Sequence, residues 1–105
     1  MATKTRREQI EAMLAEEPND PELRYMLAME HVSAGDDAGA ARVFQELIQV
    51  APEYPPAYHM LGRTLQRLNR IAESRAALTQ GIPIAQRQGN HHAAGEMMEL
   101  LQSLE

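Results

Sequence analysis

Apolar residues recur along this chain at intervals of three and four positions, which is the spacing of one face of an α-helix. Sustained alternation of apolar and polar residues, which is typical of a strand, does not occur. The residues between the stripes are mostly Ala, Glu, Gln and Arg, which favour helices. The pattern therefore predicts an all-α protein. The clearest stripes are Ile10/Met13/Leu14, Leu23/Met26/Leu27, Val43/Phe44/Leu47/Ile48, Leu61/Leu65/Leu68 and Met97/Leu100/Leu101/Leu104.

Prolines, glycines and asparagines divide the chain into segments of helical length. Pro18 and the Asn19-Asp20-Pro21 run form the first break, with Asp20 placed to cap the next helix and Pro21 in its first turn. Gly35 and Asn69 can adopt the left-handed conformation that ends a helix, and Asp36 or Asp37 can cap the helix that follows Gly35. The breaks predict six helices, at about 4–13, 21–34, 37–50, 55–68, 71–88 and 91–103.

Pro83 interrupts the fifth of these segments. Proline removes one backbone hydrogen bond and crowds the preceding turn of a helix. We therefore expect a kink near Gly81–Pro83, or a helix that ends there.

The breaks and the apolar positions repeat every 34 residues. Pro18 and Pro52 are 34 apart, and so are Pro21 and Pro55. The same interval joins further turn and core positions, namely Gly35 with Asn69, Ile10 with Phe44 and Leu78, Leu14 with Ile48 and Ile82, and Leu27 with Leu61. A register shared by prolines, turn residues and core residues indicates a structural repeat.

A helix-turn-helix period of 34 residues resembles the tetratricopeptide repeat. Residues 21–54 offer Leu27-Ala28, Ala40, Phe44 and Pro52 at the family's positions, and depart from it at Arg24, His31 and Leu47. Residues 55–88 offer Tyr58, Leu61-Gly62, Leu65, Ser74, Leu78 and Gly81, and lack the closing proline at Gln86. The small residues Ala28, Gly62, Ala40 and Ser74 would allow the two helices of a pair to approach closely.

The resemblance implies a right-handed superhelical stack of antiparallel helix pairs, a TPR-like α-solenoid of about six helices. It divides one domain of residues 1–105 into an N-terminal half-repeat helix (4–18), two repeats (21–54 and 55–88) and a C-terminal capping helix (89–105). In this frame Gly95-Glu96 occupies the Leu-Gly position of the capping helix, a polar replacement that suits a terminal helix.

Composition narrows the class of protein. The chain has 105 residues, no cysteine and a net charge of −5, so it suits one small domain without disulfides or thiolate metal sites. No apolar run approaches the roughly 18 residues of a membrane span, and no apolar segment follows the polar N-terminus as a secretory signal requires. We therefore expect a cytoplasmic protein that binds neither membrane nor nucleic acid.

The charge is unevenly distributed along the chain. Residues 8–61 carry eleven acidic residues against Arg24 and Arg42, whereas residues 62–88 carry five arginines against Glu73. Solvated helix faces are the simpler interpretation, and a polar groove or a head-to-tail contact surface is the alternative.

Nothing in the sequence groups into a catalytic, cofactor or metal site. His91 and His92 are adjacent, so they point about 100° apart on a helix, and we expect them to be exposed. His31 occupies a core position, where a packed histidine is expected. The pairs Glu16-Glu17 and Asp36-Asp37 lie at helix ends, where capping and dipole compensation explain them. We therefore predict neither an enzyme nor a bound cofactor.

The family resemblance implies that the first helices of the repeats line a concave groove. The residues carried over to that groove are Tyr25, Met29, Val32, His59, Arg63 and Gln66. Flexible Met and amphipathic Tyr suit a surface that receives a peptide or a helix. The chaperone-binding carboxylate clamp of the family is disfavoured, because Tyr25 and Met29 stand at two of its positions. The first hypothesis is thus a protein interaction module, and the groove could instead be covered by helix 91–103 or a dimer partner.

A structural role is the second hypothesis. The exposed faces of the first and last helices could drive homodimerisation or docking into a larger complex, and the acidic first half could meet the arginine band head to tail.

Overall fold

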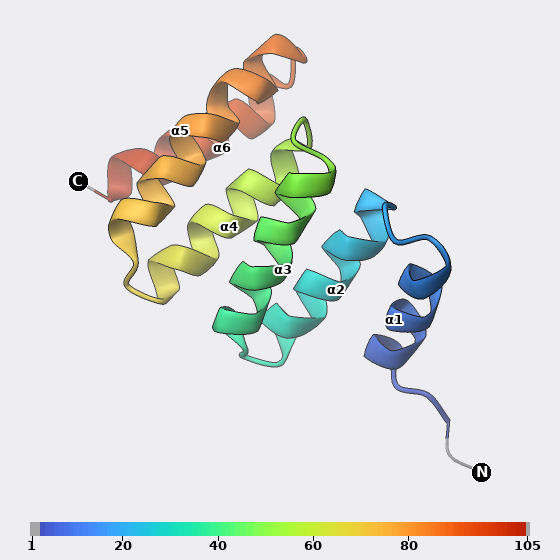
Figure 1. The fold of residues 1–105 in the computed structure, drawn as a ribbon. Helices are drawn as coiled ribbons and strands as arrows, with labels where there is room; N and C mark the ends of the chain where they lie inside the picture. The colour runs from blue at the N-terminus through green and yellow to red at the C-terminus, as the bar shows by residue number, and fades with distance from the viewer. Residues whose placement is uncertain (1–2, 105) are drawn as a thin grey trace.

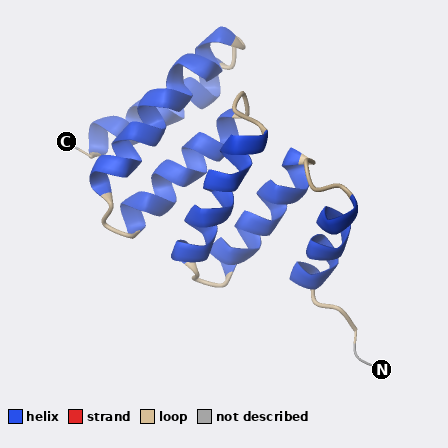
Figure 2. Ribbon diagram, viewed as in Figure 1, coloured by secondary structure: helices blue, strands red, loops and turns tan. Residues whose placement is uncertain are grey.

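The computed structural model describes residues 3–104 and contains six α-helices joined by short turns (Figures 1 and 2). No strand occurs within that range. Residues 1, 2 and 105, which the predicted domain bounds include, lie outside the described residues. The helices are α1 (Arg6–Glu16), α2 (Pro21–Ser33), α3 (Asp37–Val50), α4 (Pro55–Arg67), α5 (Ile71–Arg87) and α6 (His91–Ser103). The predicted all-α fold and its six helices are confirmed.

The first helix differs from its predicted extent of 4–13. It begins at Arg6, because Thr5 and Glu8 form a capping box: the Glu8 N–H donates to the Thr5 hydroxyl at 3.1 Å, and the Thr5 N–H donates to the Glu8 carboxylate at 3.0 Å. It continues to Glu16, since the residues before Pro18 are good helix formers.

Three turns share one geometry. Gly35, Asn69 and Gly89 have φ values of 75°, 59° and 71°, in the left-handed region that the sequence predicted for Gly35 and Asn69. At each turn, the residue that follows the left-handed one donates its N–H to the carbonyl five residues before itself. Asp36 donates to His31 at 2.9 Å, and Arg70 donates to Leu65 at 2.8 Å. This bond satisfies a carbonyl that the helix end leaves free, and it ends α2, α4 and α5 in the same way. Asp36, not Asp37, caps α3.

Pro83 does not end α5. The helix runs without interruption from Ile71 to Arg87, so of the two predicted alternatives, a kink or a helix end, the helix end is wrong and the kink stays a prediction. Pro83 itself is exposed, whereas Ile84 and Ala85 beyond it are buried. Burial of the last turn against the core offsets the one backbone bond that Pro83 removes.

The length of α5 shifts the register of α6. Helix α5 has 17 residues and α3 has 14, so α2, α4 and α6 begin at residues 21, 55 and 91, with spacings of 34 and then 36. The seventh residue of each of these helices is therefore Leu27, Leu61 and Met97. Met97 is fully buried, whereas Gly95 is only partly so. The predicted placement of Gly95-Glu96 at the Leu-Gly position is thus wrong, and Met97-Met98 takes it.

The helices stack in chain order into an elongated body with overall dimensions of 50 × 28 × 20 Å. Each helix contacts the next, and α4 also contacts α6 (Figure 1). One core cluster, which includes Phe44 and Leu65, fills the space among α2, α3 and α4, and a second, which includes Leu78 and Met97, fills the space among α4, α5 and α6. Ile48 packs against both clusters and joins them. The helices α2, α4 and α6 run in the same direction, antiparallel to α3 and α5.

Candidate functional site

The six predicted groove residues lie in two stripes on neighbouring helices. Tyr25, Met29 and Val32 are on α2, and His59, Arg63 and Gln66 occupy the equivalent places on α4. Spacings of four and three keep each set on one side of its helix.

The stripe on α2 is half-buried. Tyr25, Met29 and Val32 all pack against the cluster among α2, α3 and α4, so each offers only part of its surface. The ring of Tyr25 stands edge-on to Phe44 and Tyr54, with centroid distances of 5.9 and 6.0 Å. Burial raises the pKa of Tyr25, and the nearby Arg63 guanidinium opposes that rise.

Arg63 links the two stripes. Its charge acts on Tyr25 across the α2–α4 boundary and on His59 within α4. Arg63 is exposed, and within residues 3–104 it forms no ion pair. The guanidinium is therefore available to a negatively charged group of a ligand.

A third helix contributes to the same surface. Burial lowers the pKa of His59, Arg63 lowers it further, and the carboxylate of Glu96 on α6 opposes both. Glu96 also pairs with His92 at 3.3 Å. We define the A-helix face, named for the first helix of each pair, as the surface formed by Tyr25, Met29, His59, Arg63 and Glu96 on α2, α4 and α6.

Sequence reasoning missed two residues at this surface. The 34-residue period places Glu96 at the glycine position of a terminal helix, and this register does not predict its place near His59. Tyr54, the N-cap residue of α4, meets the ring of Tyr25 edge-on although it lies in the turn before that helix. Burial raises the pKa of Tyr54, and the carboxylates of Glu22 and Asp20 add to that rise, so this end of the face is acidic.

The remaining histidines have the surroundings that the sequence predicted. His31 is 2% exposed, and its Nδ1 lies 2.9 Å from a carboxylate oxygen of Asp36. The other oxygen of Asp36 accepts the Gly39 N–H at 2.9 Å, so Asp36 joins the end of α2 to the start of α3. His91 and His92 are exposed at the start of α6. In residues 3–104 no three His, Asp or Glu side chains are grouped to hold a metal ion.

The length and hydropathy of the described helices do not reach those of a membrane-spanning segment.

Comparison with known proteins relates the chain to other helical repeat proteins. The sequence model of the tetratricopeptide repeat matches residues 31–97. A TPR repeat-containing protein of Pseudomonas aeruginosa is 32% identical over 98 residues, which make up 93% of each chain.

Solved structures show the same similarity. The crystal structure of a tetratricopeptide repeat domain protein from Salinibacter ruber is 30% identical and has a TM-score of 0.76, over 81% of this chain and 94% of that one. The solution structure of a protein from Bordetella parapertussis is 27% identical with a TM-score of 0.82, over 97% of this chain and 89% of that one.

Proposed function

This chain belongs to the tetratricopeptide repeat family, whose fold supports protein–protein interaction, and we propose that it holds a peptide or helix of a partner protein on its A-helix face. In this proposal residues 21–54 and 55–88 are the two repeats that present Tyr25, Met29, His59 and Arg63, and α6 adds Glu96. Val32 and Gln66 would extend it by one turn along α2 and α4.

One observation carries the proposal: Arg63, which is exposed and forms no ion pair with the described residues 3–104, lies near half-buried apolar side chains. Arg63 can form a bidentate pair with a carboxylate, while Tyr25 nearby offers a half-buried ring and Met29 lies one turn further along the same side of α2. A partner segment that carries an acidic residue next to an apolar one matches this arrangement. Such complementarity would fix the register of the bound segment and speed its association.

Affinity capture with a variant of this face tests the proposal. Replacing Met29 by Ala and Arg63 by Glu together should abolish capture of the partners that the wild type retains. Circular dichroism should show unchanged helicity, since Arg63 is exposed and Met29 only partly buried.

The matched control is Arg42→Glu, which makes the same charge change at an exposed position of α3. The proposal predicts that this variant keeps the wild-type partners. Unchanged capture by the Met29/Arg63 variant, or an equal loss in the Arg42 variant, would contradict it.

The exposed methionines of the terminal helices support a second candidate, assembly through the ends of the stack. Met13 on α1 and Met98 on α6 are each 45% exposed. Light scattering at low and high salt tests this candidate, and a strict monomer at high concentration in both conditions counts against it. Met13→Glu and Met98→Glu should each weaken any self-association that appears.

The chemistry of the two ends favours the first candidate. Arg6 stands one repeat before Ala40 and two repeats before Ser74, and Met98 is the eighth residue of its helix, as are Ala28 and Gly62 in theirs. Those small residues are buried where paired helices meet, whereas Arg6 and Met98 are long and exposed. Neither end therefore repeats the close-packing surface used between helices within the stack.

A further inference from the structure

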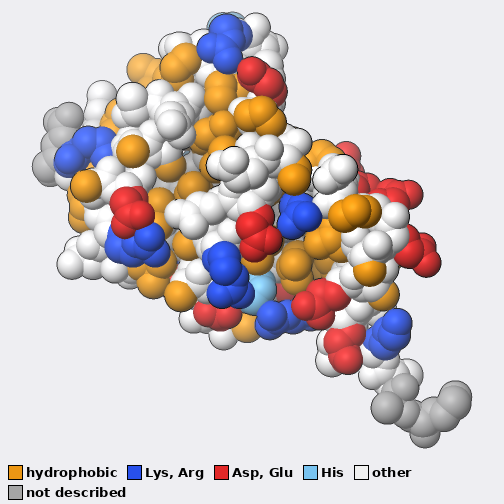
Figure 3. Space-filling view, in the orientation of Figure 1, with side chains coloured by type: hydrophobic (Ala, Val, Ile, Leu, Met, Phe, Trp, Pro, Cys, Tyr) orange, Lys and Arg blue, Asp and Glu red, His pale blue; other side chains and the backbone are white. Residues whose placement is uncertain are grey.

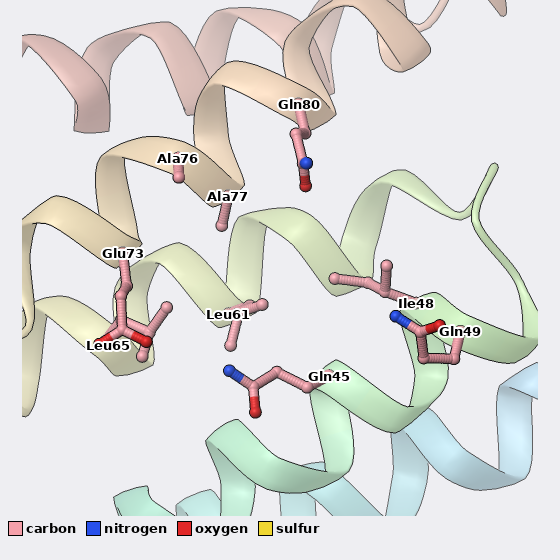
Figure 4. A pocket seen from close by; sticks show the side chains of 9 residues that line it. All are labelled: Gln45, Ile48, Gln49, Leu61, Leu65, Glu73, Ala76, Ala77 and Gln80. Atoms are coloured by element: carbon pink, nitrogen blue, oxygen red, sulfur yellow. The ribbon is translucent and has the colours of Figure 1, made fainter.

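A groove runs between α3 and α5 on the side of the molecule that faces the viewer in Figure 3, where apolar side chains gather in a hollow. Its floor is α4, through Leu61 and Leu65, and its walls are α3 and α5 (Figure 4). One part has a volume of about 240 Å³, and an adjoining part, which shares Ile48, Gln49 and Gln80 with it, continues toward Pro83 and Arg87. We call this hollow the α3–α5 groove.

The α3–α5 groove is separate from the A-helix face. Leu61 and Leu65 line the groove, whereas His59 and Arg63 lie on the A-helix face, each two residues away along α4. Two residues correspond to about 200° around a helix, so the two surfaces lie on opposite sides of α4.

Three glutamines set the polar chemistry of the groove. Gln45 and Gln49 lie one turn apart on the α3 wall, and Gln80 lies on the α5 wall (Figure 4). All three are exposed, and none of their side-chain amides forms a hydrogen bond to another group of residues 3–104. Each amide can donate and accept at once, as the peptide unit does.

The charged groups at the groove are already paired. Glu73 accepts two hydrogen bonds from Arg70, at 2.6 and 2.7 Å, and Glu53 pairs with Arg87 at 3.3 Å. An uncharged ligand therefore matches the groove better than an acidic or basic one, because it leaves these pairs intact.

From these observations we propose that the α3–α5 groove binds an extended, uncharged segment of a partner protein, with Gln45, Gln49 and Gln80 hydrogen-bonded to the backbone of that segment. An extended strand carries N–H and C=O groups that need partners, whereas a helix satisfies its own, so amide-lined walls suit the strand. Leu61 and Leu65 are buried and close the floor, and the small, exposed Ala76 leaves room between the walls for apolar side chains of the segment.

The test uses linear 12-residue peptides selected from a phage-displayed library on the full chain and then synthesised. We expect selected sequences that are apolar and carry no net charge, with binding followed by fluorescence anisotropy. Ala76→Arg places a long side chain in the groove from an exposed position, and it should weaken binding at least tenfold. Arg63→Glu, on the opposite side of α4, should leave binding unchanged.

Two further measurements test the backbone contacts. Gln49→Leu with Gln80→Leu preserves side-chain bulk and increases apolar surface, so it should weaken binding only if the amides bond to the peptide. N-methylation of every second backbone amide of the peptide should also weaken binding. The loss should be at least tenfold for one of the two sets of amides, the odd-numbered or the even-numbered.

Several outcomes would overturn the proposal. Binding unaffected by Ala76→Arg, or lost on Arg63→Glu, would place the peptides elsewhere, and the latter would support the A-helix face instead. Binding that survives both the leucine pair and N-methylation would exclude backbone recognition. Self-association of the wild type that Ala76→Arg abolishes would identify a second copy of this chain as the occupant.

Discussion

The hydroxyl of Ser74 donates a 2.6 Å hydrogen bond to the carbonyl oxygen of Gly62, and this bond joins α5 to α4 inside the core. Ser74 is fully buried, so the contact is shielded from water. One repeat earlier, Ala40 and Ala28 hold the equivalent places, and both are also fully buried. Small side chains thus let both helix pairs pack closely, and the second pair adds a hydrogen bond.

Substitution at Ser74 should separate the contribution of the hydrogen bond from that of size. Ser74→Ala reproduces the first repeat and should lower the free energy of unfolding by about 1 kcal/mol, the usual value of one hydrogen bond. Ser74→Val adds bulk where the helices meet and should lower it by about 1–3 kcal/mol more. Chemical denaturation measures both, and Ala72→Val, at an exposed site of the same helix, is the control. Equal effects of the two Ser74 variants would contradict close packing at this contact.

Gly81 and Gly95 differ in the space around them, although both lie inside helices. A Cβ atom on Gly81 would lie 2.5 Å from the Tyr58 Cβ and 2.8 Å from the Met97 sulfur, whereas one on Gly95 would meet nothing within 4 Å. The Tyr58 Cβ is fixed to the backbone of α4, so relief requires α4 and α5 to separate. Gly81→Ala should therefore lower the free energy of unfolding by about 1–3 kcal/mol.

Gly95→Ala should raise the free energy of unfolding by up to about 1 kcal/mol, since alanine favours a helix more than glycine does. The two variants make the same chemical change, so thermal unfolding compares them directly. A rise in Tm for both would show that α4 and α5 are packed less tightly than the structure indicates.

The sequence predicted the parts of the fold that depend on local chemistry. Gly35 and Asn69 end helices because few other residues adopt a positive φ, and this preference is visible in the sequence. The start of α1 also depended on a local signal, the Thr5–Glu8 capping box, which the periodicity alone did not reveal.

Features that depend on packing were harder to predict. Whether α5 ends at Pro83 is decided by burial of Ile84 and Ala85 beyond it, and sequence spacing does not contain that information. The resulting shift of α6 determines that Glu96 lies near His59 on the A-helix face. The α3–α5 groove was missed for a related reason, because its lining residues come from three helices whose separation only the structure gives.

Pro83 should limit the stability of α5. It lacks the N–H that would donate to the Thr79 carbonyl, and its ring crowds the preceding turn. Pro83→Ala restores the donor at an exposed position and should raise the free energy of unfolding by about 1–3 kcal/mol. Pro21→Ala is the control, because proline at the first position of a helix loses no hydrogen bond and no gain is expected there. A Tm that stays unchanged or falls for Pro83→Ala would show that the helix does not strain at this residue.

Asp36 should give the fold an acid-sensitive component. The Gly39 N–H bond, and then the His31 side chain, hold the pKa of Asp36 below its ordinary value of 3.8. A carboxyl whose pKa is lower in the folded state contributes stability above the unfolded value, and loses it as pH falls from 3.8 through the folded pKa. Asp36→Asn keeps an acceptor for Gly39 but removes the charge, so stability should depend less on pH in this range. Denaturation between pH 5 and pH 2 measures how the free energy of unfolding depends on pH, with Glu99→Gln as the control. Parallel curves of stability against pH for Asp36→Asn and wild type would contradict this role of Asp36.

The ring of His59 should report whether three helices share the A-helix face. Burial and Arg63 lower the pKa of His59 from its ordinary value of 6.5, while Glu96 opposes them. Arg63→Gln should therefore raise the pKa of His59 and Glu96→Gln should lower it, and NMR titration of the ring measures both. Because protonation of His59 is disfavoured in the folded state, its contribution to stability is complete above pH 6.5 and is lost as pH falls from there through the folded pKa. If Glu96→Gln left the pKa of His59 unchanged, α6 would not contribute to this face, and a partner segment would meet only α2 and α4.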